Sequence, residues 1–167
     1  EQTNTNPPKA YPWTIASAGA DNPSLVDVLL VNPYQAVDFG SHVAGRHYIR
    51  NLYAQALHRG LFVDQCYDVG RVENVHFWPF WTEGEVTEYT KQHGIAFQFG
   101  RTDWQYVSNS FCIMYHTGFE FDDYGHGGGN VLLTQSGSDV GPIAVHVKNA
   151  QHHSGISFSN SQQYGAI

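Results

Sequence analysis

The stretch YIRNLYAQALHRGLFVDQCYDVGRVENVHFW (48–78) contains one strand pattern twice, with a second pattern between the two copies. YIRNLYA (48–54) and VENVHFW (72–78) both alternate apolar and polar residues, and their equivalent residues Ile49 and Val72 are 23 positions apart. GLFVDQ (60–65) is another short alternating run that begins with glycine. Alternation of this kind indicates strands, and Gly and Asp at their ends indicate turns. The stretch therefore predicts a repeat with two strands per unit.

Both patterns recur along the chain. The first returns as GIAFQF (94–99), GFEFDD (118–123) and PIAVHV (142–147), with a weaker copy AVDFG (36–40), and it aligns Val37, Leu61, Ile95, Phe119 and Ile143. The second returns as VSNSFCI (107–113), VLLTQ (131–135) and ISFSN (156–160), and it aligns Ile49, Val72, Val107, Leu132 and Ile156. In both series one interval is about ten residues too long, and both place the excess at TEGEVTEYTKQ (82–92). We interpret this polar segment as one insertion, with a short helix.

Regular spacing, short strands and the lack of a helical period predict a β-solenoid. We expect an all-β, right-handed parallel β-helix of about six turns, with the insertion near 82–92. An antiparallel sandwich would not require equal spacing, and leucine-rich repeats need a Leu/Asn signature that this chain lacks. We expect residues 1–24 to form an N-terminal lead-in or cap and residues 25–167 to form the β-helix domain.

Asn residues occur at equivalent positions of three strands, although Asn is depleted in ordinary strands. Asn51, Asn74 and Asn109 follow the same pattern in IRN, VEN and VSN. In a solenoid they would lie one above another, where their side-chain amides can form a hydrogen-bonded ladder along the axis. The alternative is three unrelated surface residues. We expect the ladder, with a structural role.

Composition excludes several classes of protein. Charged residues are 14% and aromatic residues 14%, with 17 Gly and 7 Pro, which suits a β-rich and loop-rich chain. A formal charge of −7 argues against a nucleic-acid partner. No apolar run approaches the ~20 residues of a membrane helix, and we expect no membrane partner. Cys66 and Cys112 form one disulfide or remain two packed free thiols.

The runs GRHYIRNLYAQALHRGLFVDQCYDVGRVENVHFWPFW (45–81) and LLVNPYQAVDFG (29–40) resemble the pectate-lyase-like, polygalacturonase-related β-helix proteins. The resemblance covers roughly residues 25–167 and is specific in 45–81. It implies a right-handed parallel β-helix from a secreted, carbohydrate-processing background, and so an extracellular location. Members of the family are usually longer, so we expect part of a helix or a helix capped by a partner.

The catalytic motifs of the polygalacturonases are not reproduced. Asp122-Asp123 and Gly125-His126-Gly127 lie within one segment, DDYGHG, and no Asn-Thr-Asp motif exists, whereas the family spreads its motifs over successive turns. The resemblance therefore assigns no catalytic roles here.

Carboxylates are the candidate catalytic groups, because glycoside hydrolysis requires two of them facing each other. The repeat alignment places Asp64 and Asp122 in one column, two turns apart, with Gln98 between them. We expect Asp122 and Asp123 as the acid–base pair, with Asp64 and Asp103 on the same wall beside Asp68. The alternative is that these residues form turns at strand ends.

Aromatic and basic residues are candidates for sugar binding. Trp78, Trp81, Trp104 and Tyr124 can offer flat apolar faces to sugar rings, and Arg71 and Arg101 can pair with uronate carboxylates. The alternative for these aromatic residues is that they cover the insertion at 82–92 or form a subunit contact. His126, His146, His152 and His153 show no metal-binding spacing, so we expect no metal and no cofactor.

We expect a carbohydrate-active β-helix that binds a polysaccharide or oligosaccharide and cleaves it as a glycoside hydrolase or polysaccharide lyase. One alternative is a non-catalytic glycan-binding or assembly module, whose open ends pair with a second copy or with further β-helix turns. A metal-dependent enzyme is a second alternative, and it requires three converging histidines.

Overall fold

The computed structural model describes residues 6–82 and 84–167, and it contains two parallel β-sheets built from alternating segments of the chain. Sheet A contains β1 (Trp13–Ala16), β3 (Gln35–Phe39), β5 (Arg59–Val63), β7 (Ile95–Phe99), β10 (Thr117–Phe121) and β13 (Ile143–Val147). Sheet B contains β2 (Ser24–Leu30), β4 (Tyr48–Ala54), β6 (Arg71–Phe77), β8 (Gln105–Ser108), β9 (Phe111–Ile113), β11 (Val131–Thr134), β12 (Gly137–Asp139) and β14 (Ile156–Ser159).

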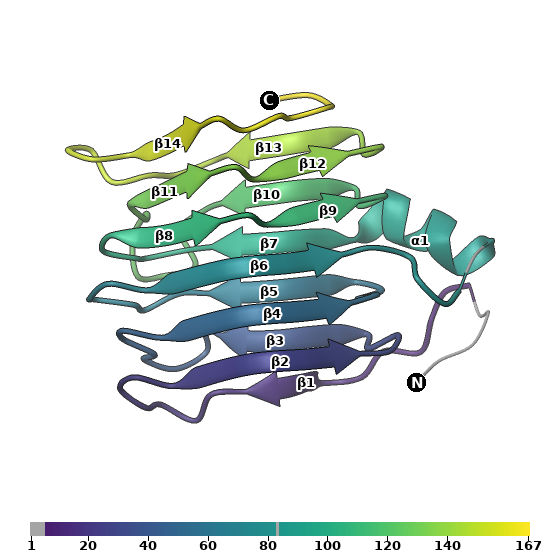
Figure 1. Ribbon diagram of the computed structural model, residues 1–167, viewed down its shortest axis with the longest axis horizontal. Coiled ribbons are helices and arrows are strands. Elements are labelled where there is room, and N and C mark those ends of the chain that lie inside the picture. The colour runs from purple at the N-terminus through teal and green to yellow at the C-terminus, as the bar shows by residue number, and fades with distance from the viewer. Residues whose placement is uncertain (1–5, 83) are drawn as a thin grey trace.

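The chain forms one rising coil, since strands of sheet A and sheet B alternate along the sequence and each pairs in parallel with its equivalent one turn away. In Figure 1 the strands of sheet B lie in front and run to the right, while those of sheet A lie behind and run to the left. Because the coil climbs from the N-terminus to the C-terminus in this view, its hand is right. The predicted parallel β-helix of about six turns is confirmed.

A column of left-handed residues bends sheet B at every turn. Asp27, Asn51, Asn74, Asn109, Gln135 and Asn160 have φ between 49° and 58°. Asn tolerates this conformation better than most residues, because its short polar side chain hydrogen-bonds locally. Asn74 Nδ2 donates to Asn51 Oδ1 at 2.8 Å, and Asn51 Nδ2 donates to Asp27 Oδ1 at 2.6 Å. The predicted column is confirmed. In the described part of the chain the side-chain hydrogen bonds run from Asn74 through Asn51 to Asp27, and the predicted step between Asn74 and Asn109 is not among them.

Stacked phenylalanines fill the interior between the two sheets. The rings of Phe97 and Phe119 lie 4.7 Å apart, and those of Phe99 and Phe121 lie 5.7 Å apart, in both cases nearly parallel. All four side chains are buried. Like residues therefore pack on like residues from turn to turn, as expected of a solenoid core.

Two of the predicted alignments are wrong in register. Leu61 and Phe119 both pair with Phe97, whereas Ile95 pairs with Arg59 and Thr117. The residue between Asp64 and Asp122 is consequently Gly100, not Gln98. In sheet B, Val107 pairs with Leu133 rather than Leu132, and Leu133 with Phe158 rather than Ile156. In sheet A, Ile143 likewise pairs with Thr117 and not with Phe119. The slips at Ile95, Ile143 and Ile156 are of two residues and keep each side chain on its face, so alternation alone does not detect them. Leu132 is off by one residue and lies on the opposite face from the buried Leu133.

The insertion forms helix α1 (Glu85–His93), as predicted, and it packs at one edge of the coil (Figure 1). The coil begins at β1, inside the 1–24 segment expected as a lead-in or cap, because Ile15 pairs with Val37 of β3. Residues 1–5 of that segment lie outside the described part. Cys66 and Cys112 are buried free thiols. Within the described residues no helix has the length and apolarity needed to cross a membrane.

Candidate functional site

The turns that lead from sheet A to sheet B lie along one edge of the solenoid, at the left of Figure 1. We call this surface the acidic edge and define it by residues 64–70, 100–104, 122–130 and 148–155. All the predicted catalytic carboxylates lie there, together with Arg101, Trp104 and Tyr124, and Arg71 begins the strand that follows the first of these turns. Trp78 and Trp81 lie at the opposite edge, beside α1. The predicted catalytic carboxylates and the predicted sugar-binding residues Trp78 and Trp81 therefore lie on two separate surfaces of the solenoid.

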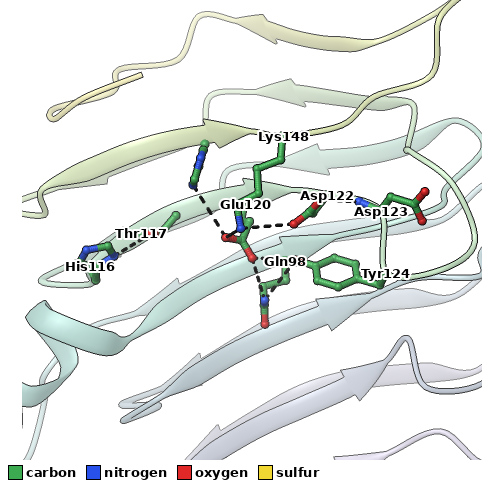
Figure 2. Close-up of polar contacts among 9 residues, drawn as sticks. Gln98, His116, Thr117, Glu120, Asp122, Asp123, Tyr124 and Lys148 are labelled. Atoms are coloured by element: carbon green, nitrogen blue, oxygen red, sulfur yellow. Dashed lines mark hydrogen bonds and ion pairs between the residues drawn. The ribbon is translucent and has the colours of Figure 1, made fainter.

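Glu120 is the centre of a buried polar network on the outer face of sheet A, beside the acidic edge (Figure 2). Its Oε1 accepts hydrogen bonds from Tyr124 Oη at 2.8 Å and from Gln98 Nε2 at 3.0 Å. Its Oε2 accepts from Lys148 Nζ at 2.7 Å, and the same Nζ lies 3.3 Å from Asp122 Oδ2. Sequence reasoning missed Glu120 and Lys148. The available signal was a charged residue between two phenylalanines, FEF, in a buried strand.

Charge in this network is fixed by its hydrogen bonds. Burial raises the pKa of Glu120, but the hydrogen bonds from Lys148, Tyr124 and Gln98 together outweigh burial and hold that pKa below its ordinary value of 4.5. The bond to Glu120 raises the pKa of Lys148, and burial together with Glu120 raises the pKa of Tyr124. Glu120 is therefore ionised at neutral pH and is paired with a lysine that keeps its charge.

Asp64 and His126 form a second pair, from turns two coils apart. His126 Nδ1 lies 2.7 Å from Asp64 Oδ2, and Asp64 Oδ1 accepts the backbone N–H of Arg101 at 2.6 Å. The Asp64 side chain is 1% exposed, whereas that of His126 is 37% exposed. The carboxylate oxygen can accept a hydrogen bond from Nδ1–H, and in that tautomer of the imidazole Nε2 is the proton acceptor. Gly100 leaves space for the Asp64 carboxylate, because a Cβ at this position would lie 2.5 Å from Asp64 Oδ1.

The other predicted carboxylates have partners of their own. Asp123 Oδ1 accepts the backbone N–H groups of Gly125 and Gly127, each at 2.8 Å, and these two bonds lower its pKa. This geometry is that of a turn-forming Asp, the alternative weighed above. Asp103 pairs with Arg101 at 3.2 Å and accepts a hydrogen bond from Gln151 at 2.5 Å.

Arg101 lies between aromatic side chains and the His126 turn. Its guanidinium stands 5.8 Å from the centre of the Tyr67 ring, and its Nη1 lies 3.8 Å from the position that a Cβ on Gly127 would take. Tyr67 is 50% exposed beside this cation, and Trp104, three residues after Arg101 along the chain, is 54% exposed on the same acidic edge. Tyr67 is a further residue that sequence reasoning missed.

The arrangement favours a proton acceptor over a proton donor. Hydrolysis of a glycosidic bond requires a carboxyl group that stays neutral through a raised pKa, whereas the pKa values of Glu120 and Asp123 are lowered. The Asp64–His126 pair instead provides a proton acceptor, which is an oriented base beside the Arg101 cation. Removal of a proton next to a carboxylate needs these two groups.

Within residues 6–82 and 84–167, no three His, Cys, Asp or Glu side chains converge as a metal site would require. Comparison with known proteins finds no matching family, no matching curated protein and no matching solved structure.

Proposed function

We propose that this protein is a carbohydrate-active β-solenoid that binds a uronate-containing polysaccharide at the acidic edge and cleaves it by elimination. The observation that carries the proposal is the buried carboxylate of Asp64, which lies 2.7 Å from the Nδ1 of a partly exposed His126. The resemblance of residues 45–81 to polysaccharide-processing β-helix proteins is consistent with such a substrate. A substrate of this kind would place the protein outside the cell.

In the proposed reaction His126 Nε2 takes the proton from the sugar carbon next to the uronate carboxylate. The electron pair of that C–H bond forms a carbon–carbon double bond as the glycosidic C–O bond breaks. The leaving oxygen then takes a proton, from the His126 imidazolium or from water, so that no other reactant is consumed. Asp64 holds the His126 ring in place and stabilises its positive charge. Arg101 pairs with the substrate carboxylate, where negative charge develops.

The aromatic rings give the sugar chain a surface to rest on. Tyr67 and Trp104 are exposed on the turns that carry Asp64 and Arg101, and sugar rings bury their C–H groups against such faces. Arg101 already pairs with Asp103, so a uronate would share this cation or displace Asp103 from it. An uncharged polysaccharide has no carboxylate to form a charge-assisted pair with Arg101, and the proposal therefore specifies uronates.

The test is to incubate the protein with polygalacturonate, alginate, hyaluronan and a neutral xylan, and to measure both unsaturated products by ultraviolet absorbance and new reducing ends. We expect unsaturated products from at least one uronate polymer, and none from xylan. His126→Ala should lower the rate at least ~100-fold, the range expected when a general base is removed. His152→Ala, which changes an exposed histidine on the same edge, is the matched control and should retain activity.

A non-catalytic glycan-binding module is the second candidate, because Asp103, Asp122 and Asp123 all have structural partners. Uronate binding without product from any polymer would favour this candidate. Reducing ends without unsaturated products would contradict elimination and indicate hydrolysis.

A further inference from the structure

Three aromatic rings are exposed in sequence after β6, at the edge opposite the acidic edge. Trp78, Phe80 and Trp81 are 43%, 38% and 43% exposed. The rings of Trp78 and Phe80 are stacked, with centres 5.2 Å apart and planes 3° from parallel, and Phe80 lies 4.9 Å from Trp81. An exposed group of rings of this kind is unfavourable in water unless a ligand or partner covers it.

Buried polar groups hold this segment in one conformation. The Oε1 of Gln55 accepts the backbone N–H groups of Trp81 at 2.8 Å and Thr82 at 3.0 Å, and its Nε2 donates to the Thr82 carbonyl at 2.6 Å. Gln55 is only 4% exposed. The ring of His76 lies beneath, 4.9 Å from Trp78 and 5.7 Å from Phe80. The rings are therefore pre-organised, which lowers the entropy that a ligand must overcome on binding.

Beside Trp78 a groove of about 420 Å³ opens between the aromatic segment and α1. Its lining is mainly apolar, with two polar side chains from the helix: Trp78, Pro79, Gly84, Thr87, Glu88, Ile113 and Met114. Small-molecule sites typically combine an apolar wall with a few polar groups that set orientation. Here the indole face supplies the wall, and Glu88, whose side chain is 57% exposed, supplies hydrogen-bond acceptors for hydroxyl groups.

Charge decides between classes of sugar at this site. Glu88 is the one charged residue among the described residues of the lining, and its Oε1 lies 3.3 Å from Lys91 Nζ, so these residues include no cation to pair with the carboxylate of a uronate. Neutral pyranose rings have apolar C–H faces for Trp78 and hydroxyl groups that can donate to Glu88.

We propose that this groove, which we call the Trp78 groove, is a binding site for a neutral oligosaccharide, separate from the acidic edge. The proposal does not depend on the elimination reaction, because it uses none of the residues of the acidic edge. It assigns α1 a role, since the inserted helix forms one wall of the groove. A protein with both sites would hold a neutral chain at one edge while it acts on a uronate chain at the other.

The test is titration calorimetry with cellohexaose, xylohexaose and mannohexaose, and with hexagalacturonate as the acidic probe. We expect binding of at least one neutral hexasaccharide, weakened tenfold or more by Trp78→Ala and a few-fold by Glu88→Gln. Trp104→Ala removes another exposed tryptophan, 54% against 43% for Trp78, from the acidic edge and is the matched control. It should leave this affinity unchanged, as should His126→Ala.

The melting temperature of each variant shows whether the fold is retained, and Glu88→Gln keeps the test valid if Trp78→Ala unfolds. The proposal is overturned if none of the three neutral probes binds, or if the bound probe loses affinity in Trp104→Ala rather than in Trp78→Ala. Loss of cleavage in His126→Ala with unchanged neutral binding would separate this site from the proposed function.

Discussion

Asn74 combines an unusual backbone conformation with two side-chain hydrogen bonds. Its φ is 52°, and its Nδ2 donates to Asn51 Oδ1 at 2.8 Å and to Tyr53 Oη at 2.9 Å. Only Gly enters the left-handed region without steric cost, whereas Asn enters it at a moderate cost that local hydrogen bonds offset. The amide ladder therefore stabilises the bend of sheet B in two ways, through conformation and through contacts between turns.

Two substitutions at Asn74 separate these contributions. Asn74→Gly keeps the conformation and removes the hydrogen bonds, so we expect a loss of about 1–2 kcal/mol in the free energy of unfolding. Asn74→Ala also adds the left-handed strain, so we expect a further loss of about 1 kcal/mol. Urea denaturation at neutral pH measures both. Equal losses in the two variants would show that the conformation contributes nothing.

At the residue scale the sequence was informative where the repeat placed like residues together. It predicted the Asn51, Asn74 and Asn109 column, because the same polar residue recurred at the same point of three strands. It did not predict Glu120 or the Asp64–His126 pair. His126 lies in a glycine-rich turn that has no counterpart in the neighbouring units, so no periodicity predicts where its side chain will point.

Helix α1 is attached to the solenoid by a group of stacked rings and a few hydrogen bonds. Tyr89 Oη lies 3.3 Å from Tyr34 Oη and 3.5 Å from His58 Nδ1, and the rings of Tyr34 and His58 are stacked 4.9 Å apart. Thr90 Oγ1 donates to the Leu57 carbonyl at 2.8 Å. The backbone N–H of His116 also donates to the Thr90 carbonyl at 3.2 Å. The inner strands pair with neighbours in both directions along the coil, whereas the helix is attached through these side-chain and backbone contacts.

We expect Tyr89→Ala to loosen the helix without loosening the coil. The variant removes the ring that packs on His58 and His93, so amide hydrogen exchange across 85–93 should become at least ~10-fold faster, as local opening becomes easier. Exchange in β7 and β10 should change little. Tyr106→Ala, which removes a 45% exposed tyrosine from β8, is the control. Faster exchange throughout the coil would show instead that α1 supports the solenoid.

At the element scale the sequence predicted the existence of the strands and the site of the insertion, but it predicted the register of only some strands, among them Val37 with Leu61 and Ile49 with Val72. Ile95 and Phe97 are both apolar and point to the same side, so nothing in GIAFQF distinguishes a pairing with Leu61 from a slip of two. The Phe97–Phe119 stack selects the observed register through packing between turns, which a single strand does not reveal. For this reason the prediction placed Gln98 between Asp64 and Asp122, although it assigned these two carboxylates correctly to one column.

Across the whole molecule, several titratable groups have a protonation state in the folded protein that differs from their state in the unfolded chain over part of the pH range. Burial lowers the pKa values of His47, His58 and His76, and that of His47 falls from 6.5 to about 4. These histidines are therefore neutral in the folded protein at pH values where the unfolded chain already binds protons. The network of Lys148, Tyr124 and Gln98 lowers the pKa of Glu120 despite its burial, so this carboxylate is also stabilised in its deprotonated form.

The buried histidines and Glu120 both lead us to predict that the folded protein loses stability in acid. A lowered histidine pKa contributes stability that is fully present above pH 6.5 and is lost as the pH falls toward 4. For His47 alone the difference corresponds to about 3 kcal/mol. Glu120 contributes stability that is present above pH 4.5 and is lost as the pH falls through its lowered pKa. The free energy of unfolding should thus fall in two steps, one beginning near pH 6.5 and one below pH 4.5.

Urea denaturation at a series of pH values measures this dependence. His47→Gln removes the titrating group, so the slope between pH 6.5 and 4 should become shallower even if the variant is less stable at neutral pH. His152→Ala, which changes an exposed histidine, should leave the slope unchanged. A slope in His47→Gln as steep as in the unmodified protein would mean that the acid sensitivity arises elsewhere. Because the comparison uses slopes rather than absolute stabilities, it distinguishes loss of the buried imidazole's proton binding from simple loss of its packing.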